Sequence, residues 1–291
     1  MTSLKKKMVC MSAVAALLVI VCGCTPMLRS GIKVAHPAIE NIEVALFQQK
    51  NLDLVEKGLP GQILLLEGLL GTAPNDPLLL TMAVKAYTGL GMLVEDEHPE
   101  KATALYTRGT ECGMRLLKQH RGFRKAIEKG KSVGEATKQI KSKKFAPSLL
   151  WTASCMGANV LLNAGDPMIA IDLAPVNTMA NHVAELDSNY FHGFAHMFVG
   201  TVNSMLPATF GGDKKKAKEA FDTIDKMNKG KFLLPKVFYA KFYLTDDKDA
   251  EMTLRKIIDT PDGEMPEIEL LNQIAKAKAR FILKQRGLLE Q

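Results

Sequence analysis

Aromatic residues and cysteines are scarce in this chain, and apolar runs long enough to span a membrane are missing. Of its 291 residues, 6% are aromatic and five are cysteines. So few aromatic rings argue against a surface that binds nucleic acid by stacking, and no nucleic-acid partner is expected. Beyond the N-terminus no apolar run reaches 18 residues, so we expect the rest of the chain to lie outside the bilayer. Strand patterns are nearly absent, which argues against a sheet-based fold.

Catalytic constellations are also missing. No serine, histidine and acid arrangement stands out, and no pair of carboxylates is placed for hydrolysis, so we expect neither an enzyme nor a cofactor. His192 and His196 in "HGFAH" have the i, i+4 spacing of zinc peptidases, but those enzymes need a glutamate where this chain has Gly193. Since no third ligand is evident, we predict no metal site. We interpret the two histidines as packing or cavity-lining residues on one helix face.

Two further features have ordinary structural interpretations. The segment "FGGDKKKAKEAF" (210–221) lacks the Gly-Lys-Ser/Thr order of a phosphate-binding loop. We therefore interpret Asp213 as the N-cap of a helix whose first turn carries the lysines. Cys112 and Cys155 both lie in helical patterns. They could pair in an oxidising compartment, but we favour two buried thiols.

The chain begins with a basic segment followed by an apolar one. Three lysines precede fourteen uncharged residues, 8–21. As a helix these would extend about 21 Å, which is shorter than the roughly 30 Å hydrocarbon core and typical of a signal peptide. The segment "VCGC" (21–24) resembles a bacterial lipobox, which implies cleavage after Gly23 and lipidation of Cys24. A plain signal peptide, an uncleaved anchor and a Cys-x-Cys metal site are the alternatives.

This interpretation divides the chain into a cleaved signal peptide (1–23), a lipidated tether (24–33) and one helical domain (34–291). Removing residues 1–23 takes away three lysines and no acidic residue, which lowers the formal net charge from +7 to +4. We expect a protein anchored in the bacterial envelope by its lipid and facing the periplasm. Pro26 in place of aspartate favours the outer membrane over the inner one, although that sorting rule is not universal.

Apolar residues recur with a helical period along almost the whole chain. The pattern predicts an all-α protein, an α-solenoid or bundle of about twelve helices joined by short turns. The predicted helices are 34–49, 51–71 (broken at Pro60), 76–95, 98–119, 121–142, 148–164, 167–186, 190–206, 213–229, 232–245, 249–259 and 266–288.

Small residues recur one turn before large ones at the start of several predicted helices. The pairs are Ala102 with Tyr106, Ala217 with Phe221, and Ala250 with Leu254. The last two pairs are 33 residues apart, near the tetratricopeptide period of 34. The full consensus is absent, so the pattern favours TPR-like helix pairs, with an irregular helical bundle as the alternative.

A lysine-rich stretch at about 121–144 interrupts this regularity. From Arg115 to Lys144 there are eleven basic residues and two acidic ones, Glu128 and Glu135. We interpret the stretch as a solvated helical excursion. The functional alternative is contact with anionic lipid headgroups or an acidic partner, to which a lipid anchor would give access.

Several polar or amphipathic residues lie inside otherwise apolar predicted helices. Buried polar groups need partners, either on neighbouring helices or in a ligand. Cavities that hold small molecules use a few such groups in an apolar lining. The candidates for lining a ligand cavity or pore are Trp151, Asn159, His196 and Asn203.

Five blocks of the sequence, in order and at these spacings, resemble the T-component lipoproteins of TRAP transporters. They are residues 54–91, with the "PNDPLLL" turn, 105–117, 149–167 around Trp151, 190–221, with "HGFAH" and "GGD", and 268–283. The resemblance covers nearly all of the chain after the predicted signal peptide.

The resemblance implies a lipid-anchored, all-helical protein built on TPR-like pairs. It also implies a cavity or pore in each protomer, a homo-oligomer, and docking to the periplasmic solute-binding protein of a TRAP system. Such systems take up small organic acids, and the T component is thought to assist delivery of the ligand, including hydrophobic ones. A structural envelope lipoprotein, or interaction scaffold without a ligand, is the alternative function.

Overall fold

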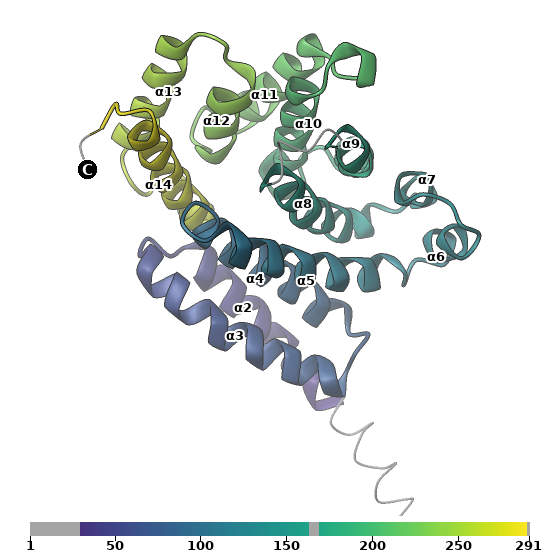
Figure 1. The fold of residues 1–291 in the computed structure, drawn as a ribbon. Helices are drawn as coiled ribbons and strands as arrows, with labels where there is room; N and C mark the ends of the chain where they lie inside the picture. The colour runs from purple at the N-terminus through teal and green to yellow at the C-terminus, as the bar shows by residue number, and fades with distance from the viewer. Residues whose placement is uncertain (1–29, 163–168, 290–291) are drawn as a thin grey trace, which may run out of the picture.

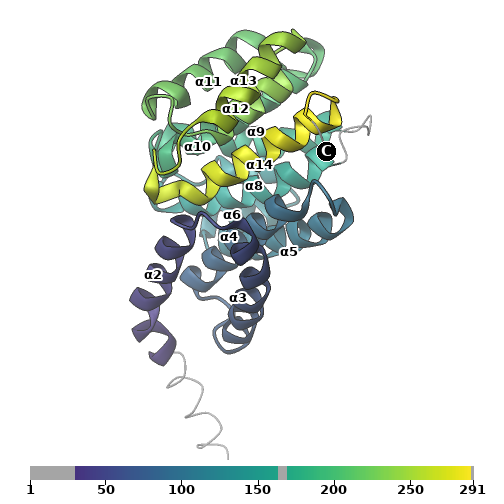
Figure 2. The ribbon, with the colours of Figure 1, turned by 90° about the vertical axis from the view of Figure 1, so that its left-hand side faces the viewer.

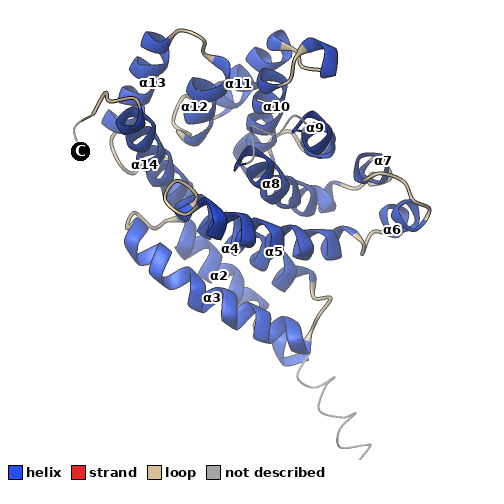
Figure 3. Ribbon diagram, viewed as in Figure 1, coloured by secondary structure: helices blue, strands red, loops and turns tan. Residues whose placement is uncertain are grey.

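The chain forms a helical array, shown in Figure 1. The structure, a computed structural model, describes residues 30–162 and 169–289, and within these ranges it contains no strand (Figure 3). The prediction of an all-α protein is therefore confirmed. The longer helices are α2 (His36–Phe47), α3 (Leu52–Thr72), α4 (Pro77–Val94), α5 (Pro99–Leu117), α6 (Arg121–Glu128), α7 (Val133–Thr137), α8 (Ala146–Leu162), α9 (Ile169–Leu186), α10 (Phe194–Met205), α11 (Lys214–Met227), α12 (Leu234–Phe238), α13 (Asp247–Asp259) and α14 (Glu269–Gln285).

Most helices pack against the next one along the chain. Contacts join α3 to α4, α4 to α5, α8 to α9, α9 to α10 and α10 to α11, while α5 packs on α8 and leaves α6 and α7 at the side. The helix α14 then returns to contact α2 and α3, and it crosses the face of the molecule in Figure 2. One continuous apolar core, from Ile32 to Leu283, joins all of these elements.

The predicted pairs of small and large residues are buried where neighbouring helices meet. A Cβ atom added to Gly91 of α4 would collide with the Tyr106 ring of α5. One added to Gly200 of α10 would lie 2.7 Å from the Phe221 ring of α11. Glycine at these two places lets the helix axes approach, and the aromatic ring fills the space. The TPR-like character of the pairs stays a prediction.

Three predicted helices differ from the structure. The helix α3 continues through Pro60, because that residue is on the exposed face, where water can bond the carbonyl that proline leaves without a donor. The predicted helix 121–142 is instead α6 and the short α7. Gly130, with φ of 75°, ends the first, and a capping box of Ser132 and Glu135 starts the second.

The third difference concerns residues 190–193. They form the short helical turn η2 (Tyr190–Gly193), in which Phe191, His192 and Gly193 all have positive φ. The helix α10 begins only after this turn. His192 and His196 therefore do not share a helix face, contrary to the prediction.

Other local predictions are confirmed. The Asp213 carboxylate accepts hydrogen bonds from the backbone N–H groups of Lys215 and Lys216, at 2.9 and 3.0 Å, and so caps α11. Cys112 and Cys155 are both buried free thiols. Burial raises the pKa of Cys155 to about 12, so this thiol stays protonated.

The predicted signal peptide (1–23) and Cys24 lie outside the described residues. Among the described residues, Pro77–Val94 and Lys143–Leu162 are long enough and have enough mean hydropathy to cross a membrane, although both contain lysines, so neither is the continuous apolar run sought in the sequence. The fold buries 67% and 56% of these two segments, as expected for core helices of an array.

The close approach at Gly91 gives a test of the packing. We expect Gly91→Ala to lower the free energy of unfolding by about 1–3 kcal/mol, because the new methyl group collides with Tyr106. Gly68→Ala is the matched control. Gly68 is in exposed helix with no atom within 4 Å of an added Cβ, so alanine there should stabilise by about 0.5–1 kcal/mol. Urea unfolding measures both, and equal effects would contradict the packing described.

Candidate functional site

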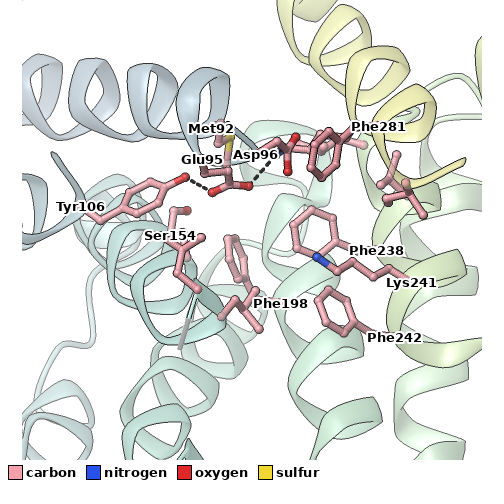
Figure 4. A pocket seen from close by; sticks show the side chains of 17 residues that line it. Met92, Glu95, Asp96, Tyr106, Ser154, Phe198, Phe238, Lys241, Phe242 and Phe281 are labelled. Atoms are coloured by element: carbon pink, nitrogen blue, oxygen red, sulfur yellow. Dashed lines mark hydrogen bonds and ion pairs between the residues drawn. The ribbon is translucent and has the colours of Figure 1, made fainter. Parts of the chain in front are cut away.

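A pocket lies where the ends of α4 and α8 meet α10, α12 and α14 (Figure 4). Its free volume, counted where the centre of a water molecule fits, is about 110 Å³. This is room for several waters or a small organic molecule. The lining is mostly apolar, with a few charged groups at one side. It comprises Met92, Glu95, Asp96, Tyr106, Ser154, Ala158, Leu161, Leu162, Phe198, Leu234, Val237, Phe238, Lys241, Phe242, Lys278, Phe281 and Ile282.

Two acidic residues mark the end of α4 at this pocket. Glu95 is the C-cap of the helix and Asp96 follows it. Carboxylates at a helix C-terminus oppose the helix dipole, so they need a cation nearby. Lys278 of α14 supplies it, with its ammonium nitrogen 2.5 Å from Glu95 and 3.1 Å from Asp96. Because the Lys278 side chain is only 8% exposed, this is a buried ion pair that joins residues 183 positions apart.

A tyrosine completes this charged cluster. The hydroxyl of Tyr106, a fully buried residue of α5, donates a hydrogen bond to the second oxygen of Glu95 (Figure 4). Burial raises the pKa of Tyr106 well above its ordinary value, and the negative charge of Glu95 adds to the effect. The phenol therefore stays protonated and keeps donating. Both oxygens of Glu95 are thus engaged by protein groups.

A second lysine of the pocket has a different setting. Lys241 lies in a π-helical turn, η4 (Tyr239–Tyr243), which continues α12. Such turns are uncommon and are frequent at functional sites. Figure 4 shows the Lys241 nitrogen directed into the pocket. The Lys241 nitrogen lies over the Phe242 ring, 5.2 Å from the ring centroid, and no described carboxylate is within ion-pair distance of it.

The surroundings of Lys241 disfavour its charged form. Lys241 is exposed as a residue, but partial desolvation of its ammonium lowers the pKa of Lys241 below its ordinary value, and the positive charge of Lys278 lowers it further, against an opposing effect of Glu95 and Asp96. An anion placed beside the Lys241 ammonium would relieve this cost. The rings of Phe198, Phe238, Phe242 and Phe281 form much of the remaining wall. The site can therefore hold a molecule that has an anionic group and an apolar body.

The residues predicted from the sequence lie elsewhere and are not brought together. Trp151 lines a smaller, more enclosed cavity between α2, α4 and α14, beside Phe47. Its ring is 4.8 Å from the Phe191 ring, and its indole N–H donates to the Tyr190 hydroxyl at 3.2 Å. Met92 lines both this cavity and the lysine pocket, so the two cavities are neighbours.

The other three predicted residues are in three different places. Asn159 lines an open groove between α5, α8 and α9. The ring of His196 is within 3.0 Å of the Ser188 hydroxyl, and burial lowers its pKa. Asn203 is buried, and its side chain donates to the Val199 carbonyl of its own helix at 2.8 Å. Among the described residues no group of three histidine, cysteine or acidic side chains is placed to hold a metal ion.

Sequence reasoning missed the lysine pocket, although two signals pointed to it. The first is the pair of lysines, Lys276 and Lys278, in the apolar segment "ELLNQIAKAKARFIL". Lysines on the buried face of a helix are nearly always paired with an acidic group, so they predict such a partner nearby. The second is the acidic pair Glu95 and Asp96 at a helix end. Neither signal shows which residues it pairs with, because the two segments lie 182 or more positions apart in the sequence.

Comparison with known families decides what kind of protein this is. The model of the family described as TRAP transporter T-component matches residues 48–288. The chain belongs to the TRAP transporter T-component family. The resemblance noted from the sequence is thereby confirmed. The T component is an accessory of TRAP transport systems, not a member of an enzyme family, and its place is with a bacterial membrane. Comparison with curated proteins finds no match.

The buried cluster predicts a large effect of removing its cation. We expect Lys278→Met in this T component to lower the free energy of unfolding by about 1–3 kcal/mol, since the half-buried Glu95 and Asp96 would lose their counter-ion. The control is Lys284→Met on the exposed side of the same helix, with an expected change within about 0.5 kcal/mol. Chemical unfolding of both variants checks this. Equal losses would show that the cluster contributes no more than a surface lysine.

Proposed function

We propose that this T component is a lipid-anchored protein of the periplasmic face that docks a TRAP solute-binding protein and holds a small organic acid in its lysine pocket. The observation that carries the ligand part is the Lys241 ammonium, which points into an aromatic pocket without a carboxylate partner. A carboxylate ligand would pair with it, while the phenylalanine rings cover the apolar body.

The pocket favours a ligand with one negative charge over a ligand with two. Glu95 and Asp96 together carry one more charge than Lys278, with which both pair, so Lys241 is the one cation of the pocket left for a ligand to pair with. The two carboxylates on that side repel a second anionic group. We therefore infer a monocarboxylate with an apolar body as the ligand class, in keeping with the organic acids that TRAP systems take up.

The anchor and the partner are the other parts of the proposal. The lipobox-like segment 21–24 supports lipidation of Cys24, and more than one acyl chain would hold the protein stably at a bilayer. An extended helical array offers the kind of surface that docks another protein. Purification from native membranes should recover a TRAP solute-binding protein with this chain, and its consistent absence contradicts the docking.

A matched pair of probes tests the ligand site. We expect octanoate to bind and 1-octanol, which has the same chain length without the charge, to bind roughly 10- to 100-fold more weakly. Lys241→Met should remove most of this difference, because it deletes the cation and keeps the apolar stem. Lys241→Arg is the control that keeps the charge. Isothermal titration calorimetry gives the affinities, and octanoate binding unchanged in Lys241→Met refutes the assignment.

The lowered pKa of Lys241 adds a pH readout to the same titrations. A bound carboxylate favours the charged ammonium, so octanoate affinity should fall as the pH rises through the lysine pKa, below the ordinary value of 10.5. Lys241→Arg should keep its affinity over that range, since guanidinium stays charged. If neither probe binds the parent protein, the structural scaffold without a ligand becomes the better function.

The anchor has its own test. We expect cells fed labelled palmitate to label the parent chain, and Cys24→Ala to lose both the label and the cleavage of the signal peptide. Cys112→Ala, at a buried thiol, is the control that keeps the label. A Cys24→Ala chain that is still labelled, or still matures and stays at the membrane, rules out lipidation at this residue.

A further inference from the structure

Basic side chains gather at the end of the array from which the chain leads back to Cys24. We call this surface the tether end and define it by residues 30–36, 73–76, 115–131 and 138–144. In Figure 1 its described parts are the start of α2, the end of α3, and α6, all towards the right-hand and lower side. The lysine-rich stretch singled out in the sequence forms most of it, and the proposed function does not use it.

Contacts between neighbouring segments hold the parts of this surface together. His36, at the start of α2, is 3.1 Å from Asp76, at the start of α4. Gln119, just after α5, donates to the Asn75 carbonyl at 2.9 Å, and Arg115 donates to the Pro74 carbonyl. The His120 and Phe145 rings then meet edge to face at 5.0 Å. The basic residues on both sides of these contacts are therefore fixed on the same end as the start of α2.

Most of the positive charge here has no ion-pair partner among the described residues. Nine basic side chains between 121 and 144 are exposed. Of the two acidic residues in that range, Glu128 pairs weakly with Arg124 at 3.8 Å, and Glu135 is engaged in the cap of α7. The fold gives no internal reason for this charge, since the stretch contributes few residues to the core. An external anionic partner would use it.

The short tether limits which partner that is. Only six positions separate Cys24 from Ser30, the first described helical residue. Six residues extend at most about 20 Å, so lipidation of Cys24 would hold the start of α2 close to the headgroups. Val34, also at this end, is 82% exposed and would be available to the interface. A surface that combines basic side chains, an exposed apolar residue and a lipid anchor is suited to a bilayer.

We propose that the tether end binds the anionic phospholipid headgroups of the membrane in which the chain is anchored. This inference rests on the proposed lipidation of Cys24. It adds a second membrane contact that orients the array, with the lysines of α6 and the following loops as headgroup ligands. Each basic side chain at such a surface contributes about fivefold to membrane association, and salt weakens the contact, because exposed charges are screened.

Lysine acetylation of the full, lipidated protein tests the orientation. The protein, purified from membranes, is reconstituted in vesicles of phosphatidylcholine alone or with about one-third phosphatidylglycerol. In anionic vesicles we expect Lys118, Lys125 and Lys144 to be acetylated at least about threefold more slowly, as read by mass spectrometry, with recovery at high salt. Lys248 and Lys256 of α13, at the opposite corner of Figure 1, are internal controls that should not change.

Charge-reversal variants separate binding from crowding at the vesicle surface. Lys118→Glu with Lys125→Glu should abolish the protection of Lys129 and Lys144. The matched pair Lys248→Glu with Lys256→Glu should leave it intact. All four lysines are exposed, so both variants are expected to fold, and circular dichroism verifies this.

Three outcomes would overturn the inference. Equal acetylation rates in both vesicle types show that the basic side chains do not bind anionic headgroups. Equal protection at α13 shows that the array has no fixed orientation. Protection that appears only when a TRAP solute-binding protein is added assigns the basic surface to a protein partner instead. Failure of the protein to float with either type of vesicle is different, because it shows that the lipid anchor itself is missing and contradicts the proposed function.

Discussion

The ion pair between Lys278 and the end of α4 is the interaction on which the rest of the molecule depends. Without this ion pair, the buried Lys278 of α14 would have no counter-ion in its apolar surroundings. The two carboxylates at the C-terminal end of α4 would lie at the negative end of the helix dipole with no cation to offset them. The lysine and the two carboxylates compensate each other's charge. They meet only because α14, near the end of the sequence, packs back beside the end of α4. A linear array of helices is thereby closed around a pocket. The hydrogen bond from Tyr106 extends the closure to α5, so three helices share one charged centre.

The two pocket lysines show how one residue type serves two purposes. Lys278 is neutralised by its neighbours and acts within the fold. Lys241 lies in a π-helical turn beside the Phe242 ring, and no carboxylate of the described residues is within ion-pair distance of it. The cluster of Glu95, Asp96 and Lys278 has one excess negative charge, so it disfavours further anions on its side of the pocket. The ion-paired cluster that stabilises the fold therefore lies beside a lysine without an ion-pair partner among the described residues.

Much of the fold could be predicted from the sequence, because helical periodicity and caps are local. Asp213 and the glycine breaks follow from neighbouring residues alone, and the pairing of Tyr106 and Phe221 with small residues follows from helix geometry. The errors had two origins, one local and one tertiary. Pro60 does not end α3, because an exposed proline costs one hydrogen bond that water replaces. At the left-handed turn of Phe191 and His192, the Phe191 ring packs 4.8 Å from the Trp151 ring, a contact between distant residues that no local pattern reveals.

The candidate site was harder to predict, for a physical reason. Its charged groups come from segments 182 or more positions apart. Taken alone, the acidic pair is explained as an exposed helix end and the lysine as part of a solvent-facing helix surface. The chosen residues Trp151, Asn159, His196 and Asn203 were selected for being polar inside apolar helices. Asn203 and His196 satisfy that polarity within a few residues of themselves, at Val199 and Ser188. The sequence alone does not show that a polar side chain forms its hydrogen bond with a nearby residue, so it could not exclude these two.

The length of α4 has a consequence for how the site meets its surroundings. Its first residue is at the tether end and its last is beside Glu95, so its 18 residues set the two about 27 Å apart. Under the proposed lipidation of Cys24 and membrane contact of the tether end, this single helix would set how far the pocket lies from the bilayer. A protein that exchanges a ligand with the pocket would then have to reach across that distance.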